Sequence, residues 1–327
     1  MIYALAAAGL CLLCLGGEML VRGAVALARH VGVSSLLIGL TVVGFGTSVP
    51  ELVVCLEAVR GGQPDIAVGD IVGSNIANVL LVLGAAALIF PIRCAPAVVA
   101  RDGAAMLASA MALVALGMTG TILPWQGGAM IAALLSFIAY SYWSETYRKT
   151  SSASLHTGET EEFADIPLTL SLSVVFLVAG IAGLIGGSKL LLAGAVPIAR
   201  EAGVSEAVIG LTLVAVGTSL PELATAVIAA VRRHTDVAIG NVLGSNIFNI
   251  LGVLGVTAIV TPLPIDAQIG NFDLWVMLAV AAVLIPFLVT GWRLDRAEAF
   301  VLLAAYAAYI GALFFELPQS LVQGALV

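Results

Sequence analysis

Two glutamates, Glu51 and Glu222, lie near the middle of long apolar segments in which charged residues are otherwise rare. Each ends the same short sequence, Gly-Thr-Ser-x-Pro-Glu, where x is an aliphatic residue. An ionised carboxylate inside a membrane span is costly unless it is paired or meets a cation. The nearest basic residues, Arg60, Arg232 and Arg233, lie toward the ends of these segments. We therefore expect the two carboxylates to bind a cation.

Further oxygen atoms accompany each glutamate. The preceding proline should break the helix, because it lacks an N–H group and clashes with the carbonyl four residues earlier. Carbonyls near residues 44–47 and 215–218 are then expected to be released, which is tolerated in a membrane where they face protein or a polar cavity. The candidate side-chain ligands on these segments are Thr47, Ser48, Thr218 and Ser219. The next segments add two pairs of residues that are four apart, Ser74 with Asn78 and Ser245 with Asn249. Such an all-oxygen set suits a hard cation such as Ca²⁺, which takes about six to eight oxygen ligands.

The elements that position these groups form an internal duplication. Residues 39–80 return at 210–251 with an offset of 171 residues, the separation of Glu51 from Glu222, and about half of the aligned positions are identical. When the second copy of such a repeat enters the membrane inverted, substrate sites lie near the bilayer midplane. A network of hydrogen bonds that only holds helices together is the alternative for the Ser and Asn residues. It does not account for two symmetric glutamates without counter-cations.

The composition is that of an integral membrane protein. Hydrophobic residues make up 61% of the 327 residues and charged residues 10%, and the mean hydropathy is +1.12. Soluble domains have about 25% charged residues. The net charge of −7 therefore says little about partners, and no basic patch suggests nucleic acid. We expect the lipid bilayer and transported ions to be the partners, with no obligatory protein partner and no cofactor.

Segments of bilayer length, about 20 residues each, predict an all-α polytopic protein of ten transmembrane helices. They lie near 2–27, 33–59, 65–90, 103–119 and 124–143, and near 167–198, 204–231, 236–261, 272–290 and 297–316. The polar stretch 144–165 divides the chain into five-helix repeats at 1–143 and 166–327. Because five is odd, the second repeat enters the membrane inverted.

The basic residues predict the orientation, since short cytoplasmic loops collect Lys and Arg. One side of the ten-helix plan has Arg29, Arg93, Arg101, Arg148, Lys149, Arg232, Arg233, Arg293 and Arg296, and the other has Arg60 and Arg200. Both termini are then expected outside the cytoplasm of a plasma (inner) membrane protein, with 144–165 as a cytoplasmic linker. We expect the four cysteines, Cys11, Cys14, Cys55 and Cys94, to be buried small apolar residues; a redox or metal role for the first two is the alternative.

At its repeated motifs the sequence resembles the cation/Ca²⁺ exchanger superfamily, and most of all the prokaryotic sodium/calcium antiporters. The resemblance rests on the Gly-Thr-Ser-x-Pro-Glu and Gly-Ser-Asn-Ile-x-Asn signatures in both repeats. It implies that Ca²⁺ is held by Glu51 and Glu222 with the carbonyls of Thr47 and Thr218. It further implies Na⁺ sites that use Ser48, Ser219, Ser74, Ser245, Asn78, Asn249 and the carbonyls of Gly44 and Ala215.

Four other residues have roles that the shared motifs do not determine. Some members of the resembled family, including its potassium-dependent branch, have an aspartate where this chain has Asn249. The change removes a charge, so we expect no K⁺ co-transport. Asp70 stands where the second repeat has Asn241, and it is a candidate extra cation ligand, an entry-path charge or a residue near the outer interface. Glu18 and Lys189 occupy equivalent positions; they either pair across the repeat axis or bond locally.

The predicted function is Na⁺/Ca²⁺ exchange by alternating access, and the resemblance implies that the first and sixth helices slide. Ca²⁺/H⁺ exchange on the same scaffold is the nearest alternative, and a channel is a broader one. An intramembrane serine protease would need a histidine base beside Ser48 or Ser219, but all three histidines lie in loops or at helix ends. We do not expect an enzyme.

Overall fold

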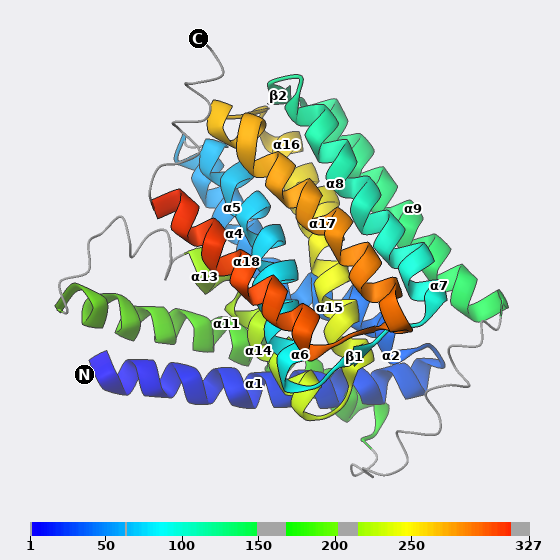
Figure 1. The fold of residues 1–327 in the computed structure, drawn as a ribbon. Coiled ribbons are helices and arrows are strands. Elements are labelled where there is room, and N and C mark those ends of the chain that lie inside the picture. Colours follow the sequence, from blue (N-terminus) through cyan, green and yellow to red (C-terminus); the bar gives the residue numbers. More distant parts are fainter. Residues whose placement is uncertain (1, 63, 149–167, 202–214, 315–327) are drawn as a thin grey trace.

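The computed structural model describes residues 2–62, 64–148, 168–201 and 215–314, and this part of the chain is almost entirely helical (Figure 1). The α-helices are α1 (Ile2–Val31), α2 (Ser35–Ile38), α3 (Gly44–Thr47), α4 (Val49–Arg60), α5 (Pro64–Ala77), α6 (Gly84–Ile89), α7 (Pro96–Val98), α8 (Ala104–Gly117), α9 (Pro124–Arg148), α11 (Leu170–Glu201), α13 (Ala215–Thr218), α14 (Leu220–Val231), α15 (Thr235–Ile247), α16 (Gly255–Val260), α17 (Leu274–Val289) and α18 (Arg296–Phe314). The π-helical turns are η1 (Gly39–Val43), η2 (Asn78–Leu83), η3 (Val99–Gly103), η6 (Phe248–Leu254) and η7 (Ile269–Asp273), and η8 (Thr290–Trp292) is a 3-10 turn.

The predicted membrane helices are present. Within the described residues, 9 helices are long and apolar enough to cross a membrane, and each corresponds to one predicted segment. The remaining segment, predicted at 204–231, is described from residue 215 onward, where α13 and the apolar α14 continue it. The predicted linker, 144–165, falls outside the described residues from 149 onward.

The two repeats are related by inversion. The spans Ile66–Ile89 and Thr235–Val260 correspond at the offset of 171 residues, and each contains a π-helical turn at the same place. Four short strands follow the same relation: β1 (Ile92–Arg93) pairs with β4 (Arg293–Leu294), and β2 (Thr121–Ile122) pairs with β3 (Leu263–Pro264). At the offset of 171 residues β1 corresponds to β3 and, to within one residue, β2 to β4, so the repeat relates the β1–β4 pair to the β2–β3 pair. Because β1 and β2 lie at opposite ends of the bundle (Figure 1), the repeats enter the membrane in opposite directions.

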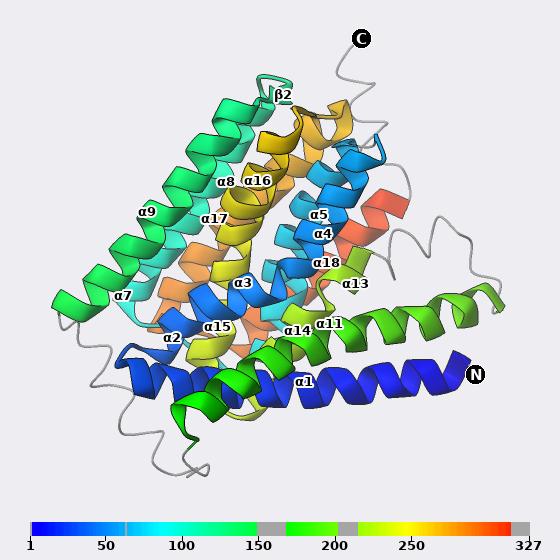
Figure 2. The same ribbon diagram turned by 180° about the vertical axis from the view of Figure 1, so that it is seen from behind.

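The long helices α1 and α11 lie side by side across the other helices (Figures 1 and 2). They are antiparallel, because Gly9 approaches Leu191, Gly16 approaches Leu184 and Gly23 approaches Leu177. A Cβ atom at Gly16 would lie 2.7 Å from the backbone nitrogen of Leu184. Small residues at such positions let two helix backbones meet, since lipid supplies no hydrophobic drive for their association. The two equivalent helices of the repeats are therefore packed as one unit.

The most buried spans are Ile66–Ile89 and Thr235–Val260, each with 78% of its apolar window inside the protein. Other helices, such as α9 and α18, expose large apolar side chains, as expected at a lipid-facing surface. The polar residues predicted to bind ions lie on the two most buried spans and on α3, α4, α13 and α14. The candidate site is therefore at the centre of the bundle.

The basic residues gather at one end of the bundle, as the ten-helix plan requires. Arg93 and Arg293 are neighbours in the β1–β4 pair. Arg296 donates hydrogen bonds to the carbonyls of Leu88 and Ile89, at the end of α6. The guanidinium of Arg233 lies over the ring of Phe90, 5.5 Å from its centroid.

A network of ion pairs and hydrogen bonds links three elements at the same end of the bundle. Arg101 Nε donates to Asp102 at 2.6 Å, and its Nη2 donates to Glu145 at 3.2 Å. Glu145 also accepts hydrogen bonds from the backbone and hydroxyl of Ser34, the residue that caps α2. The network thus joins the start of the second span to η3 and α9. Asp102 is fully buried, so its charge depends on Arg101.

We expect Arg101→Met to destabilise the protein by about 3 kcal/mol, because removing one partner leaves buried carboxylates without a counter-charge. Thermal denaturation of the detergent-solubilised protein measures this loss. The control is Arg60→Met, which removes an exposed arginine at the end of α4 and should leave the melting temperature almost unchanged. Equal melting temperatures for the two variants would show that the network is not a stabilising element.

The expectation for the cysteines is only half correct. Cys55 and Cys94 are buried, but Cys11 and Cys14 are exposed on α1. The reason is the packing of α1, which presents its glycines to α11 and leaves Cys11 and Cys14 uncovered by the described residues. All four cysteines are free, so the pair Cys11 and Cys14 forms no disulfide.

Candidate functional site

The two helical segments with the repeated Pro-Glu sequence are interrupted at one serine each. Ser48 separates α3 from α4 with φ −83° and ψ 4°, and Ser219 separates α13 from α14 with φ −84° and ψ 5°. The near-identical angles show that the same break is built into both repeats. Each break places a glutamate in the first turn of the following helix, at Glu51 and Glu222.

Fewer backbone carbonyls than predicted lose their helical hydrogen bond at these breaks. The Gly44 carbonyl still accepts the Ser48 amide at 3.2 Å, because the proline removes the donor of residue 46 rather than that of residue 44. The Gly217 carbonyl, which the second proline deprives of its donor, accepts a hydrogen bond from Ser188 of α11 at 2.6 Å. Ala215 begins α13, next to residues outside the described part.

Both glutamates are fully buried, at 0% exposure. Both oxygens of Glu51 and one oxygen of Glu222 have no hydrogen-bond partner among the described residues. The two carboxylates also lie close enough to repel each other, and Asp70 repels Glu51 as well. Buried polar groups are nearly always hydrogen-bonded, and buried charges are paired or coordinate metals. A cation between the two helices would satisfy this arrangement.

The other predicted ligands share this property. Of the 13 buried side-chain polar atoms without a partner in the described residues, ten belong to predicted ligands. These residues are Ser48, Glu51, Ser74, Asn78, Ser219, Glu222 and Asn249. In the described ranges no group of three or more His, Cys, Asp or Glu residues is placed to hold a metal ion. The arrangement therefore depends on hydroxyl, amide and carbonyl oxygens beside two carboxylates, as Ca²⁺ and Na⁺ accept.

One half of the candidate site is held together across the repeats. Thr47 Oγ1 donates to Asn241 Oδ1 at 3.1 Å and lies 3.3 Å from Ser245 Oγ. Ser245 is in turn within 3.5 Å of a Glu222 oxygen and 3.4 Å of the Gly44 carbonyl. We call Gly44, Thr47, Glu222, Asn241 and Ser245 the Glu222 half-site. It combines the broken helix of the first repeat with α14 and α15 of the second.

The inverted counterpart lies around Glu51. Here Thr218 Oγ1 donates to Asp70 Oδ1 at 3.5 Å, the equivalent of the bond between Thr47 and Asn241. Ser74 follows Asp70 by one turn of α5 and is buried. We call Glu51, Asp70, Ser74 and Thr218 the Glu51 half-site. The repeat therefore produces two half-sites that face each other near the middle of the bundle.

The amides Asn78 and Asn249 occupy special places in their helices. Asn78 begins η2, and Asn249 is the second residue of η6. Both are fully buried and unpartnered in the described part of the chain. π-helical turns are rare and often occur at functional sites. Each of these π-helical turns contains one of the two amides, and the sequence alone did not predict the turns.

Gly240 and Gly244, which precede Ser245 on α15, allow close packing of this helix. A Cβ atom at Gly240 would lie 2.6 Å from the Leu36 carbonyl oxygen, and one at Gly244 would lie 2.1 Å from that of Leu40. α15 therefore lies directly against α2 and η1. Gly69 and Gly73 are the corresponding glycines of α5. The segment of the second repeat that corresponds to α2 and η1 falls outside the described residues, so the matching contact is not described.

Sequence reasoning missed two asparagines at the repeat axis, although the repeated Gly-Ser-Asn motif contains both. Asn246 Nδ2 donates to the Asn75 carbonyl at 3.4 Å and lies 3.6 Å from the sulfur of Met106. Asn75 Nδ2 lies 3.8 Å from the sulfur of Met277, the equivalent residue of the other repeat. These asparagines join the repeats beside the candidate site. Ser188 was also missed, because its single hydroxyl on α11 has no signal in the sequence.

Glu18 bonds locally and to the bundle rather than to Lys189. It accepts a hydrogen bond from Arg22 Nε at 2.5 Å, four residues further along α1. It also accepts two hydrogen bonds from Arg232, at the end of α14. Lys189 is exposed on α11. The Glu18–Arg232 pair is a polar link between α1 and the rest of the bundle.

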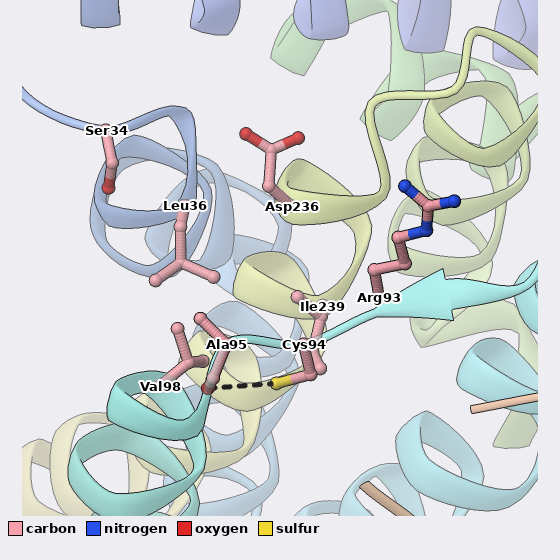
Figure 3. Close-up of a pocket in the computed structure, with 8 residues that line it drawn as sticks. All are labelled: Ser34, Leu36, Arg93, Cys94, Ala95, Val98, Asp236 and Ile239. Atoms are coloured by element: carbon pink, nitrogen blue, oxygen red, sulfur yellow. Dashed lines mark hydrogen bonds between the residues drawn. The ribbon is translucent and has the colours of Figure 1, made fainter. Parts of the chain in front are cut away.

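A small surface pocket lies away from the glutamates. It is lined by residues such as Arg93, Cys94, Val98, Asp236 and Ile239, at the starts of α7 and α15 (Figure 3). Its volume of about 20 Å³ is close to that of a single water. The pocket lies at the end of the bundle where the basic residues gather, and we do not assign it a role in ion binding.

Two inverted repeats, broken helices at the centre of the bundle and buried polar side chains without partners in the described residues are typical of a secondary transporter. The comparisons with known proteins agree. The family model for sodium/calcium exchanger proteins matches residues 1–143 and 172–315. The chain belongs to the sodium/calcium exchanger family.

Similar proteins match over nearly the full chain. The putative antiporter CaxA of Alkalimonas amylolytica is 38% identical over 94% of this chain and 96% of its own length. The inner membrane protein YrbG of Escherichia coli K12 is 36% identical over 89% of this chain and 88% of its own. Structures of the sodium-calcium exchanger NCX_Mj, one of them soaked with zero Na⁺ and Ca²⁺, superpose with a TM-score of 0.80 at 30% identity, covering 95% of this chain and 98% of theirs. The protein is a multi-pass membrane transporter and not an enzyme, with ions as its substrates.

Proposed function

We propose that this protein is a secondary active antiporter that exchanges Na⁺ for Ca²⁺ at one central site. The observation that carries the proposal is the pair of fully buried glutamates whose oxygens lack partners in the described residues. The similarity to an exchanger whose structures were soaked with Na⁺ and Ca²⁺ supports the choice of ions. The site comprises Glu51, Glu222, Thr47, Thr218, Ser48, Ser219, Ser74, Ser245, Asn78, Asn249 and the carbonyls of Gly44 and Ala215.

Competition at shared carboxylates makes exchange obligatory. The two glutamates supply a charge of about −2, which one Ca²⁺ or two Na⁺ neutralise, and an empty site leaves two buried charges unpaired. The transition between the two access states is therefore costly without an ion. In this proposal the paired helices α1 and α11 move against the remaining bundle and open the site to each side in turn. The inverted repeats provide two states of nearly equal structure.

We further propose the orientation and the domain limits. The end of the bundle with Arg93, Arg233, Arg293 and Arg296 faces the cytoplasm, because basic residues are retained there. Both termini then lie on the extracytoplasmic side of the plasma (inner) membrane. The repeats occupy residues 1–143 and 166–327, joined by a cytoplasmic linker at 144–165. Fusion of a reporter to either terminus tests the sidedness.

The transport assay uses proteoliposomes loaded with Na⁺ and diluted into ⁴⁵Ca²⁺. The proposal predicts uptake that requires Na⁺ inside and stops when Na⁺ is present at equal concentration outside. Loading with K⁺ should give no uptake. Uptake driven by a pH gradient without Na⁺ would assign Ca²⁺/H⁺ exchange instead, and Ca²⁺ flux without any counter-ion would indicate a channel.

A further inference from the structure

The two half-sites differ in charge at one position. Asp70 of the Glu51 half-site corresponds to Asn241 of the Glu222 half-site. Each accepts a hydrogen bond from a threonine of the opposite repeat, at 3.5 Å from Thr218 and at 3.1 Å from Thr47. Asp70 therefore contacts a predicted ligand, Thr218, of the opposite repeat.

Asn241 and Asp70 cannot make the same contacts. The amide nitrogen of Asn241 donates to the backbone carbonyl of Glu222 at 3.4 Å. A carboxylate has only acceptor oxygens when ionised, so Asp70 cannot make the equivalent bond to the carbonyl of Glu51. Among the described residues, its second oxygen accepts only from the Cys55 thiol, at 3.9 Å. A thiol is a weak donor and does little to offset the charge.

Asp70 places a second negative charge beside Glu51. The two carboxylates repel each other, and neither forms an ion pair with a basic residue in the described part of the chain. Both Glu51 oxygens are buried and unpartnered there. The Glu51 half-site therefore carries two carboxylates and the Glu222 half-site one.

The half-sites also lie toward different ends of the bundle. Asp70 is the seventh residue of α5, which starts at the end opposite β1, and Asn241 is the seventh residue of α15, which starts beside β1 (Figure 1). Because the repeat axis lies in the plane of the membrane, it exchanges the two faces. An extra charge in one half-site therefore acts mainly on ions that enter from one face.

We propose that Asp70 is a specificity-determining residue that raises the affinity of the central site for Ca²⁺ that enters through the Glu51 half-site. The inference rests on the proposed function. It gives the exchanger a higher apparent Ca²⁺ affinity on the face nearer Asp70, which is the extracytoplasmic face in the proposed orientation. Asp70 acts as an anionic neighbour of the ion rather than as a third carboxylate ligand. Asn241 sets the lower affinity of the opposite face.

The test swaps the two residues. Wild type, Asp70→Asn, Asn241→Asp and the double variant are compared in right-side-out and inverted membrane vesicles, with the Ca²⁺ concentration for half-maximal Na⁺-dependent flux measured at each face. Removing one nearby charge at low effective dielectric is expected to weaken affinity by roughly tenfold. Asp70→Asn should raise this concentration by that factor at the extracytoplasmic face and little at the other. Asn241→Asp should lower it at the cytoplasmic face, and the double variant should reverse the wild-type asymmetry.

Each of the two single variants tests the proposal by itself. Both single substitutions are nearly isosteric, and melting temperatures establish that the variants are folded. If Asp70→Asn does not fold, Asn241→Asp still tests the charge effect at the other face. Equal changes at both faces, or no change in either variant, would overturn the proposal. A wild-type protein without Na⁺-dependent Ca²⁺ flux would instead contradict the proposed function, so the two failures are distinguishable.

Discussion

Glu51→Gln and Glu222→Gln should each reduce Na⁺-dependent Ca²⁺ transport by at least about a hundredfold. Glutamine keeps the size of the side chain and removes the charge, and losing one charged partner in a desolvated site costs about 3 kcal/mol or more. Initial rates of ⁴⁵Ca²⁺ uptake into Na⁺-loaded proteoliposomes measure the effect. Both variants should fold, since the substitution removes a buried charge repulsion between the two helices.

The matched control is Glu57→Gln, in the same helix as Glu51 but exposed. It should transport at the wild-type rate. If Glu57→Gln is as inactive as Glu51→Gln, the loss reflects damage to α4 rather than loss of a ligand. If both buried glutamates can be replaced without loss, a central two-glutamate site is wrong.

Gly244→Ala should abolish transport and lower the melting temperature, although it adds one methyl group. The new Cβ would lie 2.1 Å from the carbonyl oxygen of Leu40 and 2.7 Å from its Cα. Backbone atoms cannot rotate away, so α15 and η1 must separate, at a cost of about 1–3 kcal/mol or more. The separation would displace Ser245, which contacts Gly44 and Glu222. Thermal denaturation and uptake rates measure the two effects.

Gly128→Ala is the control for this substitution. Gly128 is exposed on α9, and an added Cβ there meets no described atom within 4 Å. It should match the wild type in stability and transport. Equal behaviour of the two alanine variants would mean that the contact between α15 and η1 is not tightly constrained, and that the geometry of the Glu222 half-site does not depend on it.

Much of the fold follows from the sequence because lipid imposes simple requirements. A helix that spans the bilayer needs about 20 apolar residues, so the spans near 65–90 and 236–261 were predicted to within a residue at most boundaries. The odd number of helices per repeat determines the inversion. The repeated Pro-Glu sequence likewise predicts both helix breaks, because proline removes one particular backbone donor.

Other features depend on contacts between distant segments. The π-helical turns at Asn78 and Asn249 change the hydrogen-bonding pattern without any Pro or Gly at the asparagine to mark them. Cys11 and Cys14 are exposed because the glycine face of α1 packs against α11, which a single helix does not reveal. The donor to the Gly217 carbonyl comes from Ser188, nearly thirty residues earlier.

The candidate site was predictable for a different reason. Glu51 and Glu222 stand out because an unpaired carboxylate in a membrane is expensive, whatever its surroundings. Asp70 was ambiguous, since its position along α5 is compatible with either the helix end or the site. Only the hydrogen bond from Thr218 places it against the broken helix of the other repeat.

The central claim is that Na⁺ and Ca²⁺ compete for one site formed by the two glutamates. Equilibrium binding of ⁴⁵Ca²⁺ to the detergent-solubilised protein, measured over increasing Na⁺ concentration, tests it without a membrane or a gradient. We predict saturable Ca²⁺ binding that Na⁺ displaces completely and that Glu51→Gln and Glu222→Gln abolish. Ca²⁺ binding that is indifferent to Na⁺, or that persists in both glutamine variants, would contradict it.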